Sequence, residues 1–311
     1  MTYTVSVSGL RKAYGDRVVL DGIDLSVERG SVFALLGPNG AGKTTTVNIL
    51  STLVRPDAGS ATIAGHDLAT DPDGVRRSIS LTGQFAAVDE ILTAEENLLM
   101  MARLLRLDAK AARTRTRELL SEFDLEDVRD RRLKALSGGM RRRVDIAASV
   151  IVRPRLLFLD EPTTGLDPRS REQAWATVRK LTAEGVTILL TTQYLEEADQ
   201  LADRIAMLGG GRIVAEGTAD ELKSSLEGEV VRLEFADADT FERAARTVAA
   251  SDADSGRCTL DVATDGSADE VRNLLSNLDT AAIPVQRVSL FRPSLDDVFL
   301  SLTEKPKEVA R

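Results

Sequence analysis

The chain contains very little histidine or cysteine, with one residue of each, His66 and Cys258, among 311. A single cysteine cannot form an internal disulfide, which fits a reducing compartment. Cys258 is also a poor candidate for a catalytic thiol, because the sequence offers no evident route by which His66 would reach it. We therefore expect Cys258 to be an ordinary packed side chain.

Long apolar runs and an excess of basic residues are missing as well. No apolar stretch approaches the roughly 18 to 20 residues that span a bilayer, and residues 1–5 lack the basic-then-apolar pattern of a secretory signal. The net charge of -9 argues against a broad nucleic-acid surface. These absences predict a soluble, cytoplasmic chain without a nucleic-acid partner, which can still attach to a membrane through another protein.

The pattern of short apolar runs predicts an α/β core. A chain of 311 residues, 43% of them hydrophobic, is long enough for one large or two unequal domains. Continuously apolar runs are typical of strands buried on both faces of a parallel sheet, and helical patterns separate most of them. The runs cover residues 32–36, 79–81, 156–159, 186–190 and 205–208.

A β-rich N-terminus, a helical insert and a small C-terminal domain are expected around this core. In the insert, about residues 90–152, Thr93 and Glu96 have capping-box spacing. After residue 227 the sequence predicts a small α+β domain without a catalytic motif, so the expected domains are 1–227 and 228–311. The N-terminus should form short strands at 3–7, 17–20 and 23–27, with turns at Gly9, Gly15 and Gly22. The last domain should have strands at 230–235, 258–262 and 283–290 and helices at 240–250 and 268–278.

A glycine-rich loop directly follows the first buried run and matches the phosphate-binding pattern G-x-x-x-x-G-K-[ST] in full. In such a loop, backbone N–H groups and the N-terminus of the next helix bind phosphates. Lys43 would reach the β- and γ-phosphates, Thr44 would bind Mg²⁺, and Thr45 would lie near the α-phosphate. A chance glycine-rich turn is the alternative, but the strand before the loop and the helix predicted at 44–53 favour a nucleotide site for ATP. The loop consists of Gly37, Pro38, Asn39, Gly40, Ala41, Gly42, Lys43 and Thr44.

Two acidic residues, Asp160 and Glu161, end the apolar run at 156–159. Asp160 suits a second magnesium contact, and Glu161 suits a general base that polarises the attacking water. The plainer alternative is that the two acids cap the next helix. Their position downstream of a phosphate-binding loop favours the catalytic interpretation.

A third motif, Ser137, Gly138 and Gly139, lies between the loop and the acids. A serine hydroxyl and glycine N–H groups at the start of a helix form an anion site. With this motif in place, residues 3–225 resemble the nucleotide-binding subunit of ATP-binding cassette (ABC) transporters, although Met140 stands where that family usually has glutamine. The resemblance implies a P-loop NTPase core with a RecA-like parallel sheet, an N-terminal antiparallel β subdomain and a helical subdomain. It also implies a head-to-tail homodimer, in which the Ser137 loop of one chain contacts the γ-phosphate held by the other.

Four further residues gain roles from this resemblance. Tyr14 matches the aromatic that stacks on adenine, although a lone tyrosine could equally be packed. Gln84 matches the residue that contacts magnesium and the attacking water and links hydrolysis to the membrane partner. Asp167 falls in the loop that lies across the dimer interface. Gln193 stands where the family usually has histidine, so it can donate a hydrogen bond to the γ-phosphate but cannot carry a positive charge.

Three segments narrow the resemblance to the ATPase subunits of daunorubicin-resistance-type drug exporters. They are residues 83–90, 193–199 and 293–300. This resemblance implies a subunit that hydrolyses ATP at the cytoplasmic face of the membrane and powers a separate permease. The exported molecule would be a hydrophobic drug, an antibiotic or a lipid, and the C-terminal domain would be accessory or regulatory.

The alternative function is a soluble ABC-type ATPase that acts on the ribosome or on DNA. Such proteins typically carry two cassettes or a long coiled-coil insert, whereas this chain has one phosphate-binding loop and no heptad run. A metabolic kinase fits less well still, because it would have no use for the Ser137 loop.

Arginines are concentrated in the helical insert. They are expected to form a solvated face with local ion pairs to residues such as Glu118, Glu122 and Asp130. A surface for an acidic partner or lipid headgroups is the alternative. The group comprises Arg113, Arg115, Arg117, Arg129, Arg131, Arg132, Arg141, Arg142 and Arg143.

Overall fold

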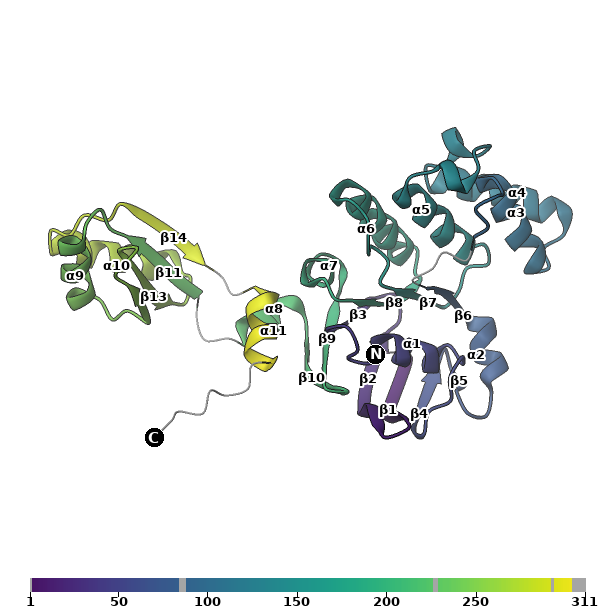
Figure 1. Ribbon diagram of the computed structural model, residues 1–311, viewed down its shortest axis with the longest axis horizontal. Coiled ribbons are helices and arrows are strands. Elements are labelled where there is room, and N and C mark those ends of the chain that lie inside the picture. The colour runs from purple at the N-terminus through teal and green to yellow at the C-terminus, as the bar shows by residue number, and fades with distance from the viewer. Residues whose placement is uncertain (1, 84–87, 226–228, 292–293, 304–311) are drawn as a thin grey trace. The chain divides into compact units, whose positions relative to one another are not determined.

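The computed structural model describes residues 2–83, 88–225, 229–291 and 294–303 (Figure 1). The chain divides into two compact units, Met1–Ala219 and Asp220–Arg311. The domain boundary expected from the sequence, between residues 227 and 228, stays a prediction. Among the described residues, no helix combines the length and the apolar character that crossing a membrane requires.

A six-stranded sheet forms the centre of the first unit. Its order is β10 (Arg212–Gly217), β9 (Arg204–Gly209), β3 (Val32–Leu36), β8 (Thr187–Thr192), β7 (Leu156–Asp160) and β6 (Ile79–Thr82). All neighbours pair in parallel except β10, which is antiparallel to β9. Every residue of β3, β7 and β8 is buried, which confirms the buried parallel strands predicted from the apolar runs.

The carboxyl ends of the parallel strands meet at one edge of this sheet. The phosphate-binding loop follows β3, Gln193 follows β8, and Gly83 follows β6. Asp160 is the last residue of β7, and Glu161 comes directly after it. Motifs that are more than one hundred residues apart in the sequence are therefore neighbours, as expected for ligand sites of α/β sheets.

An antiparallel sheet packs over the first helix of this unit, on the side opposite α5 (Gly138–Ser149) and α6 (Pro168–Ala183) (Figure 1). It contains β2 (Arg17–Glu28), β1 (Tyr3–Tyr14), β4 (Ala58–Ile63) and β5 (His66–Asp67). The prediction of short N-terminal strands was wrong, because β1 and β2 each run for 12 residues. Gly9 and Gly22 adopt positive φ at register shifts inside these strands, so they form bulges, and only Gly15 lies at the hairpin turn.

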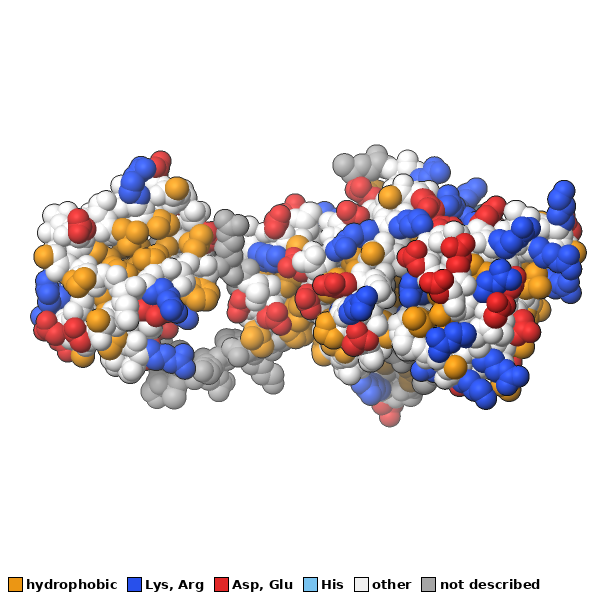
Figure 2. Space-filling model, turned by 90° about the horizontal axis from the view of Figure 1, so that it is seen from above, with side chains coloured by type: hydrophobic (Ala, Val, Ile, Leu, Met, Phe, Trp, Pro, Cys, Tyr) orange, Lys and Arg blue, Asp and Glu red, His pale blue; other side chains and the backbone are white. Residues whose placement is uncertain are grey.

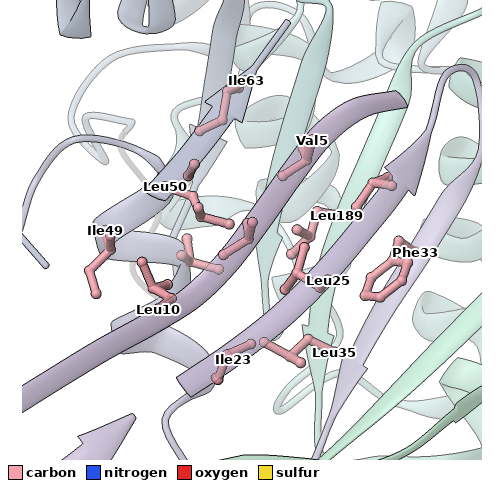
Figure 3. Packing of buried hydrophobic residues seen from close by; sticks show 14 of the residues in the cluster. Val5, Leu10, Ile23, Leu25, Phe33, Leu35, Ile49, Leu50, Ile63 and Leu189 are labelled. Atoms are coloured by element: carbon pink, nitrogen blue, oxygen red, sulfur yellow. The ribbon is translucent and has the colours of Figure 1, made fainter. Parts of the chain in front are cut away.

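The main core lies between the two sheets and encloses α1 (Lys43–Leu50). Figure 3 shows Leu10 of the antiparallel sheet near Ile49 and Leu50 of α1, and Leu25 of the same sheet on the side of Leu35 of β3. These side chains are buried almost completely. The core therefore holds β3 and α1, which flank the phosphate-binding loop, in fixed positions.

The helical insert contains α3 (Ala94–Leu104), α4 (Ala109–Glu122) and α5 (Gly138–Ser149), which confirms its predicted helical character. The capping box at α3 is present: Glu96 N donates to Thr93 Oγ1, and Thr93 N donates to Glu96 Oε2. The buried Asn97 donates to the carbonyls of Asp89 and Thr93, which fixes the segment that leads into α3. Outside the insert, this unit also has α2 (Pro72–Ser78), α6 (Pro168–Ala183) and α7 (Leu195–Leu201).

The second unit has a four-stranded antiparallel sheet with two amphipathic helices. The strand order is β12 (Asp252–Asp254), β13 (Thr259–Thr264), β11 (Glu229–Glu234) and β14 (Arg287–Phe291), and the helices are α9 (Ala238–Thr247) and α10 (Ala268–Thr280). Its core includes Leu233, Phe241 and Leu260, and Cys258 packs against it as expected. The last predicted strand starts late, at Arg287, because Ile283 is buried in the core from a loop. Two short helices, α8 (Ala219–Ser224) and α11 (Leu295–Thr303), flank this sheet in the sequence.

Phe158 tests the central sheet, because its side chain on β7 is fully buried. We expect Phe158→Ala to lower the free energy of unfolding by about 3–5 kcal/mol through the cavity it leaves. The measurement is urea unfolding followed by circular dichroism. Leu53→Ala is the control, because Leu53 is 65% exposed and should tolerate truncation. Equal unfolding midpoints for Phe158→Ala and the unmodified chain would contradict the described core.

Candidate nucleotide site

Glycines shape the loop between β3 and α1. Gly40 and Gly42 have φ values of +80° and +113°, which side chains rarely adopt. A Cβ on Gly42 would lie 2.5 Å from Leu20 Cδ2, and a Cβ on Gly37 would lie 2.4 Å from the Leu208 carbonyl oxygen. Conformation and space thus both require glycine, and the strand–loop–helix context expected of a phosphate-binding loop is present.

Lys43 is buried at the C-terminal end of this loop, and its side chain folds back toward the loop backbone. Its Nζ donates to the carbonyls of Gly37 at 2.8 Å and Pro38 at 3.2 Å. The same ammonium lies 3.4 Å from Glu161 Oε1, and both side chains are largely buried. The loop therefore places one positive charge between the backbone that would hold phosphates and the acid at the end of β7.

Asp160 is aimed at the first turn of α1. Its Oδ1 accepts a hydrogen bond from Thr191 Oγ1 at 2.5 Å and lies 3.4 Å from Thr44 Oγ1. A carboxylate oxygen and a hydroxyl at this separation are the hard oxygen ligands that Mg²⁺ prefers. The residues present therefore fit a magnesium ion held between Thr44 and Asp160.

Glu161 has an unusual backbone conformation. Its φ is +49°, in the left-handed region that costs a non-glycine residue about 1–2 kcal/mol. Its N–H donates to both the carbonyl and the hydroxyl of Thr191, each at 3.1 Å, which holds the strained conformation in place. The capping alternative was wrong for both acids, because α6 begins at Pro168 and Asp167 is its N-cap.

A cavity of about 390 Å³ opens beside the loop. Tyr14 lines it and is 50% exposed, with Lys12 Nζ 5.4 Å from the ring centroid. The ring is thus available at a cavity wall and is not packed in the core. The lining also includes Arg17, Asn39, Thr45 and Glu161.

The Ser137 loop lies apart from this cavity, whose described lining does not include it. Ser137 is the N-cap of α5, and its Oγ accepts a hydrogen bond from Met140 N at 3.2 Å. A Cβ on Gly139 would lie 2.5 Å from Ser170 Oγ, so glycine lets α5 approach the start of α6 closely. The loop is therefore a second, separate helix N-terminus in the same unit.

Asp167 lies next to this close approach. It accepts hydrogen bonds from Ser170 N at 3.0 Å and Ser170 Oγ at 2.6 Å. These bonds from Ser170 hold the pKa of Asp167 below its usual range, so the residue keeps its negative charge. The two loops that the sequence associates with a dimer interface thus pack against each other within one chain.

The remaining two predicted site residues follow strand ends. Gln193 is half-buried directly after β8, where Gly37 N donates to the carbonyl of Thr192, so its backbone adjoins the phosphate-binding loop. Gln84 lies outside the described residues, and Gly83, which precedes it, is described at the end of β6.

Glu197 has a structural role in this region that the sequence did not predict. Its side chain on α7 is completely buried and accepts hydrogen bonds from Thr163 Oγ1 at 2.8 Å and Trp175 Nε1 at 3.1 Å. Burial raises the pKa of Glu197 above its ordinary value. Its helical spacing to the buried Leu201, four residues later, was the available sequence signal. Through Glu197, α7 holds α6 and the segment that follows the two acids.

The arginines of the insert divide into two groups. Local ion pairs are confirmed for Arg115 with Glu118 and Glu122, and for Arg129 with Asp130. Figure 2 likewise shows basic and acidic side chains intermingled on the visible face of the first unit. The solvated interpretation was wrong for Arg142, which is only 8% exposed, because its position on α5 turns it toward the core.

Two family models match different parts of the chain. Residues 20–164 match the model of the ABC transporter family. Residues 217–303 match the model described as the ATP-binding protein DrrA1-3-like, C-terminal domain.

Two relatives are similar over almost the whole chain. The daunorubicin/doxorubicin resistance ATP-binding protein DrrA of Streptomyces peucetius is 52% identical, over 99% of this chain and 94% of the relative. The doxorubicin resistance ATP-binding protein DrrA of Mycobacterium tuberculosis is 49% identical, over 98% of this chain and 95% of the relative.

Solved structures resemble the chain over 71% of its length. One is an ATP binding subunit of an ABC transporter, with 33% identity, a TM-score of 0.63 and 92% of that chain covered. Another is cbiO1 from Clostridium perfringens, part of the ABC transporter complex cbiONQ, with 26% identity, a TM-score of 0.67 and 91% covered. These similarities support the expected fold of the first unit.

Glu197→Gln tests the buried acid through the pH dependence of stability. Because the native pKa is raised, the native chain binds a proton that the unfolded chain has already lost. The unmodified chain therefore loses stability as pH rises between the two pKa values, by about 1.4 kcal/mol for each unit that separates them. Glutamine keeps the size and an acceptor oxygen for Thr163 and Trp175 but has no proton to lose.

We expect urea unfolding to show Glu197→Gln as more stable than the unmodified chain at pH 8, with a margin that narrows toward pH 5. Glu196→Gln is the control, because Glu196 is exposed on the same helix. A margin that does not change with pH would contradict the raised pKa.

Proposed function

The chain belongs to the ABC transporter ATP-binding proteins of the daunorubicin/doxorubicin resistance type, and is thus an ABC-type ATPase subunit that binds ATP and works with a permease. From this premise we propose that it powers a separate integral-membrane permease that exports a hydrophobic drug, an antibiotic or a lipid. Its similarity to drug-resistance proteins over nearly its whole length supports an exporter over an ATPase that acts on the ribosome or DNA.

The observation that carries the proposal is the convergence of three groups at one sheet edge. Lys43 Nζ lies 3.4 Å from Glu161 Oε1, and Thr44 Oγ1 lies 3.4 Å from Asp160 Oδ1. The backbone from Gly37 to Thr45 would hold the phosphates of ATP, and Lys43 would exchange its carbonyl acceptors for phosphate oxygens. Tyr14 at the cavity wall would stack on the adenine.

Thr44 and Asp160, with Gln84, would hold Mg²⁺, which neutralises negative charge on the β- and γ-phosphates. Glu161 would take a proton from the attacking water, because its carboxylate lies beside the ammonium that marks the γ-phosphate position. Gln193 would donate a hydrogen bond to a γ-phosphate oxygen.

The active assembly would be a head-to-tail homodimer that encloses two ATP molecules. The Ser137 loop, Gly138 and Gly139 included, lies outside the cavity of its own chain, which fits a role at the nucleotide of a second chain. Asp167 would lie at the same interface, because Ser170 joins its loop to Gly139.

The permease would place the chain at the cytoplasmic face of the membrane. A groove of about 550 Å³ along α3 offers apolar surface for such a partner, and its lining consists of Leu92, Leu99, Met100 and Leu104 together with Glu96 and Arg103. Ile91 and Leu104 are 66% and 68% exposed. Coupling through the helical insert and the Gln84 segment would connect this surface to the nucleotide.

The transport function is tested with the purified chain and its permease in liposomes that contain daunorubicin as the probe. We expect Mg²⁺ and ATP to drive drug movement, and Glu161→Gln to abolish it while ATP still binds. Hydrolysis by Glu161→Gln should fall by about 10²–10⁴-fold, the usual contribution of a general base. Unchanged hydrolysis by this variant would disprove the role of Glu161, and absence of ATP-driven movement with the unmodified pair would remove the main support for drug export.

Gln193 is tested by two substitutions. Gln193→Ala should lower the rate of ATP hydrolysis by about tenfold or more, since it removes a donor to the developing phosphate charge. Gln193→His should retain hydrolysis but add a pH dependence between about pH 6 and 7, because imidazole titrates there and an amide does not. Steady-state phosphate release across pH 6–8 checks both. Unchanged turnover by Gln193→Ala would show that the side chain does nothing for the γ-phosphate.

A further inference from the structure

Arg142 is a buried cation that bridges the helical insert and the central sheet. It lies on α5, five residues after Ser137 and on the buried side of the helix. Its Nη1 donates to the carbonyl of Gly83 at 2.8 Å and to Asp145 Oδ2 at 3.1 Å. The first bond crosses from the insert to the end of β6, whereas the second stays within α5.

Acidic side chains lie near the buried guanidinium of Arg142. Burial lowers the pKa of Arg142, and the attraction of Asp145, Glu197 and Asp160 opposes this effect. Asp160 belongs to the proposed magnesium site, so Arg142 lies near the nucleotide site of its own chain. Gly83 adjoins that site too, because Thr82 pairs with Leu159 directly before Asp160.

The remaining nitrogens, Nε and Nη2, have no hydrogen-bond partner among the described residues. A buried donor that has no acceptor destabilises the fold. A buried ion pair also gives weak stabilisation, because apolar residues of similar volume often replace one without loss. Stability alone therefore does not account well for Arg142 and Asp145 at this junction.

The geometry points to Arg142 as a positioning residue that fixes the Ser137 loop relative to the nucleotide site of the same chain. This inference rests on the proposed homodimer, in which the two sites of one chain serve different ATP molecules. α5 carries Ser137 at its N-terminus, and the Gly83 bond anchors that helix beside Asp160. Loss of the anchor would leave ATP binding to the single chain intact but would misplace the loop that reaches the second chain.

The test measures ATP-dependent dimerisation of the full chain. Glu161→Gln is the parent, because slow hydrolysis preserves ATP, and sedimentation velocity with ATP and Mg²⁺ gives the dimer Kd. To the parent we add Arg142→Met with Asp145→Leu, which replaces the buried pair by apolar side chains. We expect a dimer Kd at least about tenfold weaker, an ATP Kd of the monomer within about twofold of the parent, and a similar urea midpoint.

Arg143→Gln in the same parent is the matched control. Arg143 is the next residue of the helix, and its Nη1 donates to the carbonyls of Phe123 and Asp124, both within the insert. It should dimerise like the parent. If the double replacement does not fold, Arg142→Lys takes its place. A lysine ammonium retains the charge but lacks the forked guanidinium that reaches Gly83 and Asp145 together. We expect Arg142→Lys to weaken the dimer Kd about threefold.

The outcomes separate this inference from the proposed function. A parent that stays monomeric with ATP would overturn the homodimer, and this inference with it. A parent that dimerises, together with Arg142 variants of equal dimer Kd, would overturn this inference alone. Equal weakening of ATP binding and dimerisation would also overturn it, because Arg142 would then act on the nucleotide site itself.

Discussion

The end of strand β8 holds both halves of the nucleotide site together. The Thr191 hydroxyl donates to Asp160 and accepts from the N–H of Glu161, while the carbonyl of Thr192 accepts from the N–H of Gly37. β8 lies between β3 and β7, so two consecutive residues secure the phosphate-binding loop on one side and the acids on the other. The strained φ of Glu161 is held by the same threonine, which gives the carboxylate its direction toward Lys43.

Buried charges are concentrated where the parallel strands end. Lys43, Asp160, Arg142 and Asp145 are all less than a tenth exposed, as is the ionisable side chain of Glu197. Each has a hydrogen bond or an opposite charge nearby, as buried ions require. Desolvation makes their mutual interactions strong, so a displacement of α5 or α7 would change the electrostatic environment of Asp160. Clusters of buried ionisable side chains are common at functional sites. Small displacements of these side chains therefore change their interaction energies.

The local sequence was sufficient to predict the phosphate-binding loop and the acidic pair, because each consists of residues that are adjacent in the chain. The loop from Gly37 to Thr44 contains its own conformational requirements, and the apolar run before Asp160 marks a buried strand. Contacts between distant segments were not predictable in this way. Arg142 belongs to a run of arginines that looks solvated, and only the packing of α5 against β6 shows that one of them is buried. Gly9 and Gly22 were predicted to lie in turns but form bulges. The sequence alone does not separate the two, because a bulge and a turn both use glycine at positive φ.

The two loops of the proposed dimer interface support each other within the chain. Gly139 lacks the Cβ that would collide with Ser170, and Ser170 in turn donates to Asp167, so the N-termini of α5 and α6 support each other. Both helices also reach the buried charges, α5 through Arg142 and α6 through the bond from Trp175 to Glu197. A second chain that contacted either loop would therefore act on elements anchored beside Asp160 and Glu161. In the proposed homodimer, the surface that would serve a neighbour's nucleotide and the site that would hold the chain's own are supported by the same buried contacts.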